Sequence, residues 1–450
     1  MTKTENPMAA RPMLPLLLSM SMPVVLSMFI QALYNIVDSM WVARLGTKAI
    51  TAVSLAYPLQ NIAMSLGVGM GVGVGSVISM SIGAKDQEQA NKAASLGIAL
   101  VTVHCVLFAL AGLVVTNPFL RMFTDDPDTF QWACDYTYVV MCASFGQLLS
   151  MCLEKIFQGL GKMKTTMFLM ASGCIINIVL DPVLIFGWFG FPAMGVKGAA
   201  IATVIGQIVG FLLYVVICVR KDIGVKIHPR YMKPDGIIIK KIYSVGIPSS
   251  LMLAMPSLLV GVLNGILTQI DKIYVAVFGL YFKLQTFINM PSSGVVQGMR
   301  PIIGFNYGAE DYKRVRQCIS YSLKIVALIM VVGTIGAIGF PDLLLGIFDA
   351  DKELLEFGIP AFRVIGLSFI FSAVGIVCAG VFEAMGQGKN SLLISLLRQF
   401  VIILPLGWVL SRFMGAIGIW ITFPIAEGIA ALIAWRMLKS SAVYEKRLKK

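Results

Sequence analysis

Gly83-Ala84-Lys85-Asp86 and Gly308-Ala309-Glu310-Asp311 each follow a long apolar run, and they lie 225 positions apart (308 − 83). Further pairs recur at this spacing: Pro23 with Pro248, Leu120 with Leu345, Phe157 with Phe382, Gly161 with Gly386 and Lys164 with Lys389. Near the end the spacing falls to 220, where Met194-Gly195 aligns with Met414-Gly415. Chance similarity between apolar runs would not give several matches at one spacing. The chain is therefore predicted to consist of two related halves.

The composition is that of a membrane protein. Of 450 residues, 58% are hydrophobic and 13% are charged, whereas soluble domains average about 45–50% and about 25%. A bilayer accommodates this much apolar surface because lipid covers the outside of a helix bundle. The formal charge of +13 could indicate a nucleic-acid binder, but the basic residues lie in short loops between apolar runs, which excludes that class.

The apolar runs predict an all-α integral membrane protein with about twelve transmembrane helices in two pseudo-twofold-related six-helix lobes. A spanning helix needs about 20 apolar residues. Candidate spans cover roughly 14–42, 50–80, 94–116, 135–158, 166–188, 196–219, 240–268, 274–302, 318–340, 357–383, 391–411 and 416–437. An even number per half gives both halves the same orientation, related by an axis along the membrane normal. The expected domains are an N-terminal lobe (1–219), a basic cytoplasmic linker (220–240) and a C-terminal lobe (241–450).

The loop charges predict the orientation, because cytoplasmic loops are enriched in lysine and arginine. With the N-terminus inside, the inner loops would contain Lys85, Lys92, Lys162, Lys164, the run from Arg220 to Lys241, Lys313, Arg314, Arg316, Lys389 and the tail from Arg436 to Lys450. The outer loops would contain Asp125, Asp126, Asp128, Asp342, Asp349, Asp351, Glu353 and Glu356. We therefore expect a multi-pass protein of the plasma or inner membrane with both termini in the cytoplasm.

The first apolar run carries an acidic residue with polar neighbours on one helical face. Ser27, Gln31, Tyr34 and Asp38 follow one another at spacings of four, three and four residues. A lipid-facing surface would not carry such a stripe, so we expect it to face a cavity. A charge at the centre of a bilayer costs about 2.5–3.5 kcal/mol on insertion scales, which makes Asp38 a first candidate for function.

Two later runs carry matching polar pairs. Asn177 and Asp181 are four residues apart, as are Thr203 and Gln207. The topology puts Asp38, Asp181 and Thr203 in the outer half of the membrane. Carboxylate, amide and hydroxyl oxygens are ligands of hard cations. Asp38, Asn177, Asp181 and Thr203 therefore predict a proton or Na+ site. Alternatively, the two aspartates are interfacial residues that fold back to water or bond to neighbouring helices.

Other polar residues in the spans are candidates for a substrate cavity or for structural roles. The cavity candidates are Gln31, Tyr34, Asn35, Gln207 and Lys283. For Lys283 the alternative is snorkelling to the interface or pairing with a carboxylate. Arg363, Arg398 and Glu427 are expected to be structural or interfacial. The role of Glu383, near a helix end beside a loop, is left open.

The sequence predicts no enzyme and no cofactor beyond the coupling ion. It has no CxxC pair, and His104 and His228 are too far apart for a metal site. No HExxH motif and no histidine cluster occur in the spans. The glycines at alternate positions from Gly67 to Gly75 lack a preceding strand and a Walker lysine, so they do not form a phosphate loop. Spaced by four, they form two small-residue ridges that favour close helix packing.

Six motifs together resemble the multidrug and toxic compound extrusion (MATE) family over essentially the whole chain. They are Asn35–Asp38, Gly83–Asp86, Phe157–Gly161, Asn177–Pro182, Gly198–Thr203 and Gly304–Ala309. The resemblance implies a twelve-helix antiporter that exports organic, often cationic, drugs in exchange for H+ or Na+. It also implies that Asp38, Asn177, Asp181 and Thr203 form the cation site of the first lobe. Some branches of the family use further acids in the second lobe. Those acids lie in the seventh span and in the middle of the tenth; here the seventh span has no acid before Asp271, at its outer end, and the tenth has only Glu383, near its inner end, so a second coupling site is not expected.

The predicted function is secondary active antiport by alternating access, performed by a monomer. Its partners would be small organic substrates and the lipid bilayer, with no nucleic acid. The alternative within transport is a flippase for lipid-linked precursors, which would have a wider, cationic cavity. A membrane-embedded enzyme, a channel or a receptor would be a different class, but a twofold repeat favours alternating access.

Overall fold

The computed structural model describes residues 6–348 and 351–445, and every element within them is helical. Asp349 and the tail beyond Glu445 lie outside the described residues. The first half contains α1 (Pro7–Ala10), α2 (Met13–Ala43), α3 (Thr47–Gly83), α4 (Gln87–Arg121), α5 (Pro127–Cys142), α6 (Phe145–Gly159), α7 (Met163–Phe186), η1 (Trp188–Gly190), α8 (Gly195–Arg220) and η2 (Pro229–Met232). The second half contains α9 (Gly236–Thr268), α10 (Lys272–Gly308), α11 (Tyr312–Gly339), α12 (Pro341–Gly346), α13 (Lys352–Gly366), α14 (Ser368–Ala384), α15 (Gly388–Leu396), η3 (Leu397–Ile402), α16 (Ile403–Met414), α17 (Ala416–Lys439) and α18 (Ala442–Glu445).

The described helices provide ten candidate membrane spans, or twelve if each of two bent pairs forms one span, the number that the sequence predicts. Ten are long and apolar enough to cross a bilayer, and two bent pairs complete the set. The pairs are α5 with α6, bent by 45°, and α13 with α14, bent by 46°. Each break has a serine and a glycine within two residues, Ser144 with Gly146 and Gly366 with Ser368, and such pairs often mark kinks.

The two halves repeat each other in local geometry. Asp86 precedes α4 and Asp311 precedes α11, and each side chain accepts a hydrogen bond from the backbone N–H three residues on, at 2.9 and 3.0 Å. Such a cap satisfies an otherwise unpaired helix donor. The residues before them, Lys85 and Glu310, are left-handed with φ of 61° and 58°. The repeated motif is therefore a helix end, a left-handed residue and a helix cap.

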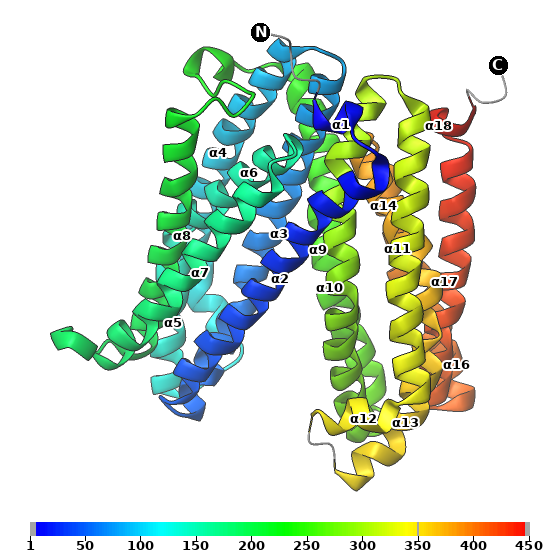
Figure 1. The fold of residues 1–450 in the computed structure, drawn as a ribbon. Helices are drawn as coiled ribbons and strands as arrows, with labels where there is room; N and C mark the ends of the chain where they lie inside the picture. Colours follow the sequence, from blue (N-terminus) through cyan, green and yellow to red (C-terminus); the bar gives the residue numbers. More distant parts are fainter. Residues whose placement is uncertain (1–5, 349–350, 446–450) are drawn as a thin grey trace. The chain divides into compact units, whose positions relative to one another are not determined.

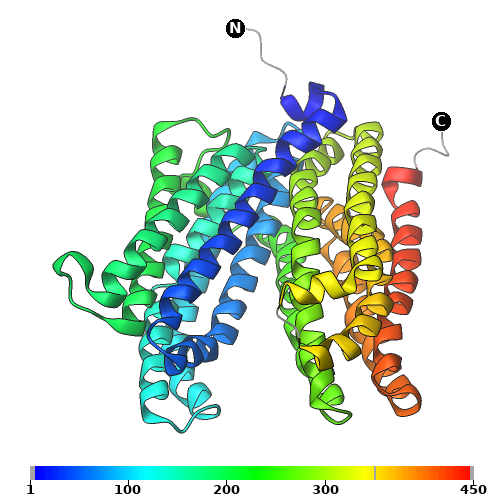
Figure 2. The same ribbon diagram turned by 60° about the horizontal axis from the view of Figure 1, so that its bottom comes forward.

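The drop in spacing from 225 to 220 has a structural cause. In the first half α7 ends at Phe186, and a loop containing η1 leads to α8; it projects from the neighbouring helices in Figures 1 and 2. In the second half the equivalent helix continues through the π-helical turn η3 to Met414, and Gly415 alone separates it from α17. Gly195, the first residue of α8, and Gly415, the residue just before α17, both have positive φ.

The helices group into two compact units. The N-terminal unit is Leu26–Ser250, and the C-terminal unit combines the described residues up to Val25 with those from Leu251 onward. These bounds differ from the domains expected at 219 and 241, because α2 and α9 each contribute to both units. The beginning of α9 packs on α3, where a Cβ added to Gly73 would collide with the backbone of Ile242. The beginning of α2 packs on α10, where a Cβ at Gly298 would collide with Ser21.

The glycines of α3 pack closely against two different helices, which confirms the predicted small-residue ridges. Gly67, Gly71 and Gly75 face α6, and a Cβ at Gly71 would lie 2.6 Å from Cγ of Lys155. Gly69 and Gly73 face α9, and a Cβ at Gly69 would collide with Ser250. Within the N-terminal unit, α3 is therefore held against α6 on one side and against α9 on another.

The outer surface of the N-terminal unit is apolar, as a lipid-facing surface must be. On α4 a run of large apolar side chains is more than half exposed: Val103, Val106, Leu110, Leu113 and Val114. Aromatic side chains of the loop after α7 are also exposed: Trp188, Phe189 and Phe191. Aromatic residues concentrate at membrane–water interfaces, so this loop has the composition of an interfacial segment.

Candidate cation site and substrate cavity

The N-terminal unit contains a cavity of about 540 Å³, lined by residues of α2, α3, α5, α6, α7 and α8. Seven residues singled out in the sequence line it: Gln31, Tyr34, Asn35, Asp38, Asn177, Thr203 and Gln207. The helical spacing in three separate spans thus marked residues that share one cavity. Of the four residues in the predicted stripe on α2, Gln31, Tyr34 and Asp38 line this cavity, and Ser27 does not.

Asp181 lies behind the cavity wall, next to Asp38. It is fully buried, at 0% exposure, and is not part of the cavity lining. Its carboxyl group is close enough to that of Asp38 for a direct interaction. Both oxygens of Asp181 and Oδ1 of Asp38 are buried and accept no hydrogen bond from any described residue. Two adjacent carboxyl groups with three buried and unpaired oxygens need a proton or a cation, because an unpaired buried charge is costly.

Asn177 and Thr203 complete the wall beside the two aspartates. The Asn177 amide Nδ2 donates a hydrogen bond to the Thr203 hydroxyl oxygen at 3.2 Å, which joins α7 to α8. Asn177 Oδ1 is buried and accepts no hydrogen bond from the described residues. The four residues therefore offer carboxylate, amide and hydroxyl oxygens, a donor set that fits a proton or Na+.

The structure does not bring Lys283 into this group. It lies on α10, in the C-terminal unit, with an exposed side chain, and it does not line the cavity. A role in substrate binding for Lys283 stays a prediction. Four other charged residues of that unit form ion pairs within it. Arg398 on η3 contacts Glu427 on α17 at 2.7 Å, and Arg300 on α10 forms an ion pair with Glu383 on α14.

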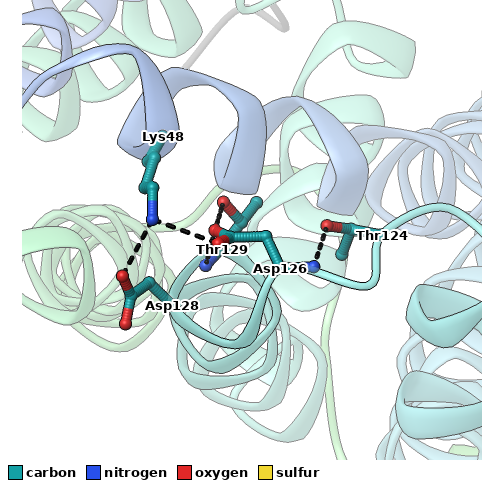
Figure 3. Close-up of polar contacts among 5 residues, drawn as sticks. All are labelled: Lys48, Thr124, Asp126, Asp128 and Thr129. Carbon is teal, nitrogen blue, oxygen red and sulfur yellow. Dashed lines mark hydrogen bonds and ion pairs between the residues drawn. The ribbon is translucent and has the colours of Figure 1, made fainter.

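A polar cluster fastens the beginnings of α3 and α5, and sequence reasoning missed it (Figure 3). Lys48 Nζ contacts carboxylate oxygens of Asp126 at 3.1 Å and of Asp128 at 2.8 Å. Asp126 also caps α5, accepting from the backbone N–H of Thr129 at 3.0 Å and from its hydroxyl at 2.6 Å. The hydrogen bonds from Thr129, with the nearby Lys48 ammonium, lower the pKa of Asp126 to about 2. At neutral pH the Asp126 carboxylate is therefore ionised.

Other cavity residues were missed although the sequence carries a signal for them. On α6, Gln147, Ser150 and Glu154 are spaced by three and four residues and all line the cavity. On α3, Tyr57, Gln60 and Met64 are also spaced by three and four residues, and they line the cavity as well. Helical spacing of polar residues, the criterion that identified the stripe on α2, also fits these two sets.

A helical fold with ten to twelve candidate spans in two repeats, and with a polar cavity inside one of them, is typical of a multi-pass membrane transporter. A family model described as MatE matches residues 23–183 and 248–409, and these two segments correspond to the two halves of the repeat. The chain belongs to the MatE family, and it is a transporter, not an enzyme.

Known proteins resemble the chain along nearly its full length. The multidrug export protein MepA of Staphylococcus aureus is 25% identical over 424 residues, covering 94% of this chain and 93% of MepA. The MepA of Staphylococcus saprophyticus is 27% identical over 415 residues, covering 92% and 91%. A solved outward-facing structure of a multidrug resistance MATE family transporter superposes with a TM-score of 0.88, at 26% identity and 96% coverage of each chain. The family and the fold that the sequence motifs indicate are thus confirmed.

Proposed function

We propose that the protein is a secondary active antiporter that exports organic, often cationic, drugs in exchange for H+ or Na+. Relatives that align over nearly the whole chain are multidrug export proteins. The single observation that carries the coupling role is the adjacency of Asp38 and Asp181, whose buried oxygens receive no hydrogen bond from the described residues.

The coupling mechanism follows from the cost of burying charge. A proton or Na+ bound between Asp38 and Asp181 neutralises them and stabilises a conformation in which the pair is enclosed. Without the ion, repulsion favours a conformation that admits water. The ion can drive transport only because it binds these two conformations with different affinity. Helix α2 carries Asp38 and also contains Pro23, and an internal proline weakens helix hydrogen bonding, so bending of α2 is the proposed movement.

The side chains of the cavity wall favour organic substrates over inorganic ions. Its wall combines aromatic, thioether and amide side chains, including Tyr34, Met64, Tyr136, Met151 and Met170. Aromatic rings attract cations, and flexible methionines adapt to ligands of different shape. The substrates we propose are therefore flat or bulky apolar molecules with a positive charge.

The charge of the cavity argues against the flippase alternative. The described lining residues include two acids, Asp38 and Glu154, and no lysine or arginine. A lipid-linked precursor carries phosphate and needs cationic partners, so the observed charge is the opposite of the one required.

Both termini are proposed to be cytoplasmic, because the basic loops then lie inside, and the protein is proposed to act as a monomer. Reporters of cytoplasmic and external exposure fused to each terminus test the orientation; an external signal from either end would contradict it. The mass of the detergent-solubilised protein after subtraction of bound detergent tests the monomer.

The coupling role is tested with Asp38→Asn and Asp181→Asn in proteoliposomes with an imposed pH or Na+ gradient. Each substitution removes a charge while keeping the shape, and we expect gradient-driven ethidium transport to be lost. The matched control is Asp125→Asn, on an exposed residue outside the cavity, which should transport as the unmodified protein does. Full gradient-driven transport by both aspartate variants would exclude the proposed coupling.

A further inference from the structure

Glu154 is a second carboxylate on the cavity wall, far along the chain from the proposed coupling site. It lies near the end of α6, and Asp38 lies near the end of α2. The span formed by α5 and α6 is the fourth of the N-terminal unit and α2 is the first, so they run in opposite directions across the membrane. Glu154 and Asp38 therefore lie toward opposite ends of the cavity.

Glu154 belongs to a closed hydrogen-bonded triangle on α6. The Lys155 ammonium Nζ donates to Glu154 Oε1 at 3.1 Å and to Gln158 Oε1 at 3.0 Å. The Gln158 amide Nε2 donates to Glu154 Oε1 at 2.6 Å. Lys155 and Gln158 thus both donate to Oε1 of Glu154. The Glu154 side chain is still 21% exposed on the cavity wall.

The packing of α3 against α6 fixes the position of the Lys155 ammonium. The residue is 7% exposed, and its aliphatic stem passes over the glycine ridge of α3, where a Cβ at Gly71 would lie 2.6 Å from Cγ. The ammonium is therefore an internal counter-ion held beside Glu154. Burying a charged pair in the wall of a membrane cavity costs free energy, and ionisable residues inside the membrane are therefore candidates for a functional role.

The neighbouring wall offers polar atoms that no described residue engages. Tyr214 on α8 lines the same cavity and is 3% exposed, and its hydroxyl has no hydrogen-bond partner among the described residues. The same holds for Oε1 of Gln207. The Tyr214 ring packs against Phe157 with centroids 5.3 Å apart, so the ring is fixed in place. This part of the cavity thus combines one anionic group with an aromatic ring and two uncommitted oxygens.

We propose that Glu154 binds the positive charge of the transported organic cation and that Lys155 competes with that cation for the carboxylate. This inference rests on the proposed export of cationic drugs and assigns a residue that recognises them. The permanent competition by Lys155 weakens cation binding enough for release, while Gln158 keeps the carboxylate oriented when no substrate is bound. Glu154 is separate from the aspartates proposed to bind the coupling ion.

The test is equilibrium binding of tetraphenylphosphonium to the full chain in detergent micelles, with no ion gradient. Glu154→Gln removes the charge but keeps an oxygen for Lys155 and Gln158, and we expect the Kd to rise about tenfold. Lys155→Met keeps the aliphatic stem over the glycine ridge and removes the competing charge, and we expect the Kd to fall several-fold. A merely structural ion pair would make both variants change in the same direction, because each breaks the same contact.

A second ion pair of the same unit supplies matched controls. Glu88 and Lys92 on α4 are paired at 3.1 Å and do not line the cavity. Glu88→Gln and Lys92→Met should leave tetraphenylphosphonium binding unchanged. If Glu154→Gln is not monodisperse, Glu154→Asp replaces it in the test. This variant keeps the charge but moves it away from the cavity, and its Kd should rise by less than the tenfold expected for Glu154→Gln.

Opposite shifts from the two α6 variants support the proposal, and any other combination overturns it. Its failure is distinguishable from failure of the proposed antiport. The binding measurement involves no coupling ion gradient, whereas the antiport is tested by gradient-driven transport in the Asp38 and Asp181 variants.

Discussion

The Asn177 amide donates a hydrogen bond to the Thr203 hydroxyl at 3.2 Å, across the contact between α7 and α8. Close by, the two helix backbones approach at paired glycines, where a Cβ at Gly206 would lie 2.9 Å from the carbonyl oxygen of Gly173. The wall that carries the proposed ion ligands is therefore fixed by both a polar and a steric contact. This rigidity keeps Asn177 Oδ1 near the two aspartates.

Thr203→Val should weaken the proposed ion site. The substitution keeps the side-chain shape but leaves the Asn177 amide without its acceptor, and a buried unsatisfied donor costs about 1–3 kcal/mol. We expect a lower melting temperature and a several-fold higher ion concentration for half-maximal transport. Thr203→Ser, which keeps the hydroxyl, should be close to the unmodified protein. An unchanged ion dependence in Thr203→Val would contradict the assignment.

Gly71→Ala should destabilise the N-terminal unit, because its Cβ would lie 2.6 Å from the stem of Lys155. Overpacking of this kind costs about 1–3 kcal/mol. Thermal unfolding in detergent measures the effect. The control is Gly265→Ala on α9, where nothing lies within 4 Å of the added atom; its melting temperature should be unchanged or slightly higher, since alanine favours helix. Equal melting temperatures for the two variants would show that the ridge does not set the helix spacing.

Arg398 and Glu427 should behave as a mutually dependent buried pair. Their side chains are 14% and 8% exposed, and two guanidinium nitrogens of Arg398 contact one carboxylate oxygen at 2.7 and 3.0 Å. Removing one partner of such a pair typically costs about 3–5 kcal/mol, because the other charge is left uncompensated. Arg398→Met and Glu427→Met should each destabilise the protein, and the double variant should recover much of the loss. Additive losses in this double-mutant cycle would mean that the two charges act independently.

The cap at the beginning of α5 should make stability depend on acid pH. The folded-state pKa of Asp126, about 2, is below the unfolded value of about 3.9. A lowered carboxyl pKa contributes stability that is complete above the unfolded value and is lost as pH falls toward the folded value. The melting temperatures of the protein and of Asp126→Asn should therefore differ at neutral pH and converge from about pH 4 to about pH 2. A difference that stays constant over that range would rule out this contribution.

Residues related by helical spacing were predictable from the sequence, and contacts between distant segments were not. Asp38, Asn177 and Thr203 each belong to a polar pair or stripe on one helical face, which is enough to predict a shared cavity. The partners of Lys48 are 78 and 80 positions away, and nothing local indicates them.

The same limit applies to the compact units and to the triangle on α6. The unit boundaries within α2 and α9 depend on where glycines such as Gly73 and Gly298 admit a neighbouring backbone, which only the packed helices define. The sequence does place Glu154, Lys155 and Gln158 close together. It does not indicate that a glycine ridge on α3 holds Lys155 in place or that Glu154 faces the cavity.

The most direct measurement of the central claim is ion movement caused by substrate in proteoliposomes. Ethidium is added to one side, and the flux of H+ or Na+ in the opposite direction is followed with an ion-sensitive dye. We predict a counterflow in the unmodified protein that is absent in Asp38→Asn and in Asp181→Asn, because each variant lacks one of the two carboxylates between which the ion binds. An equal counterflow in both variants would contradict the account.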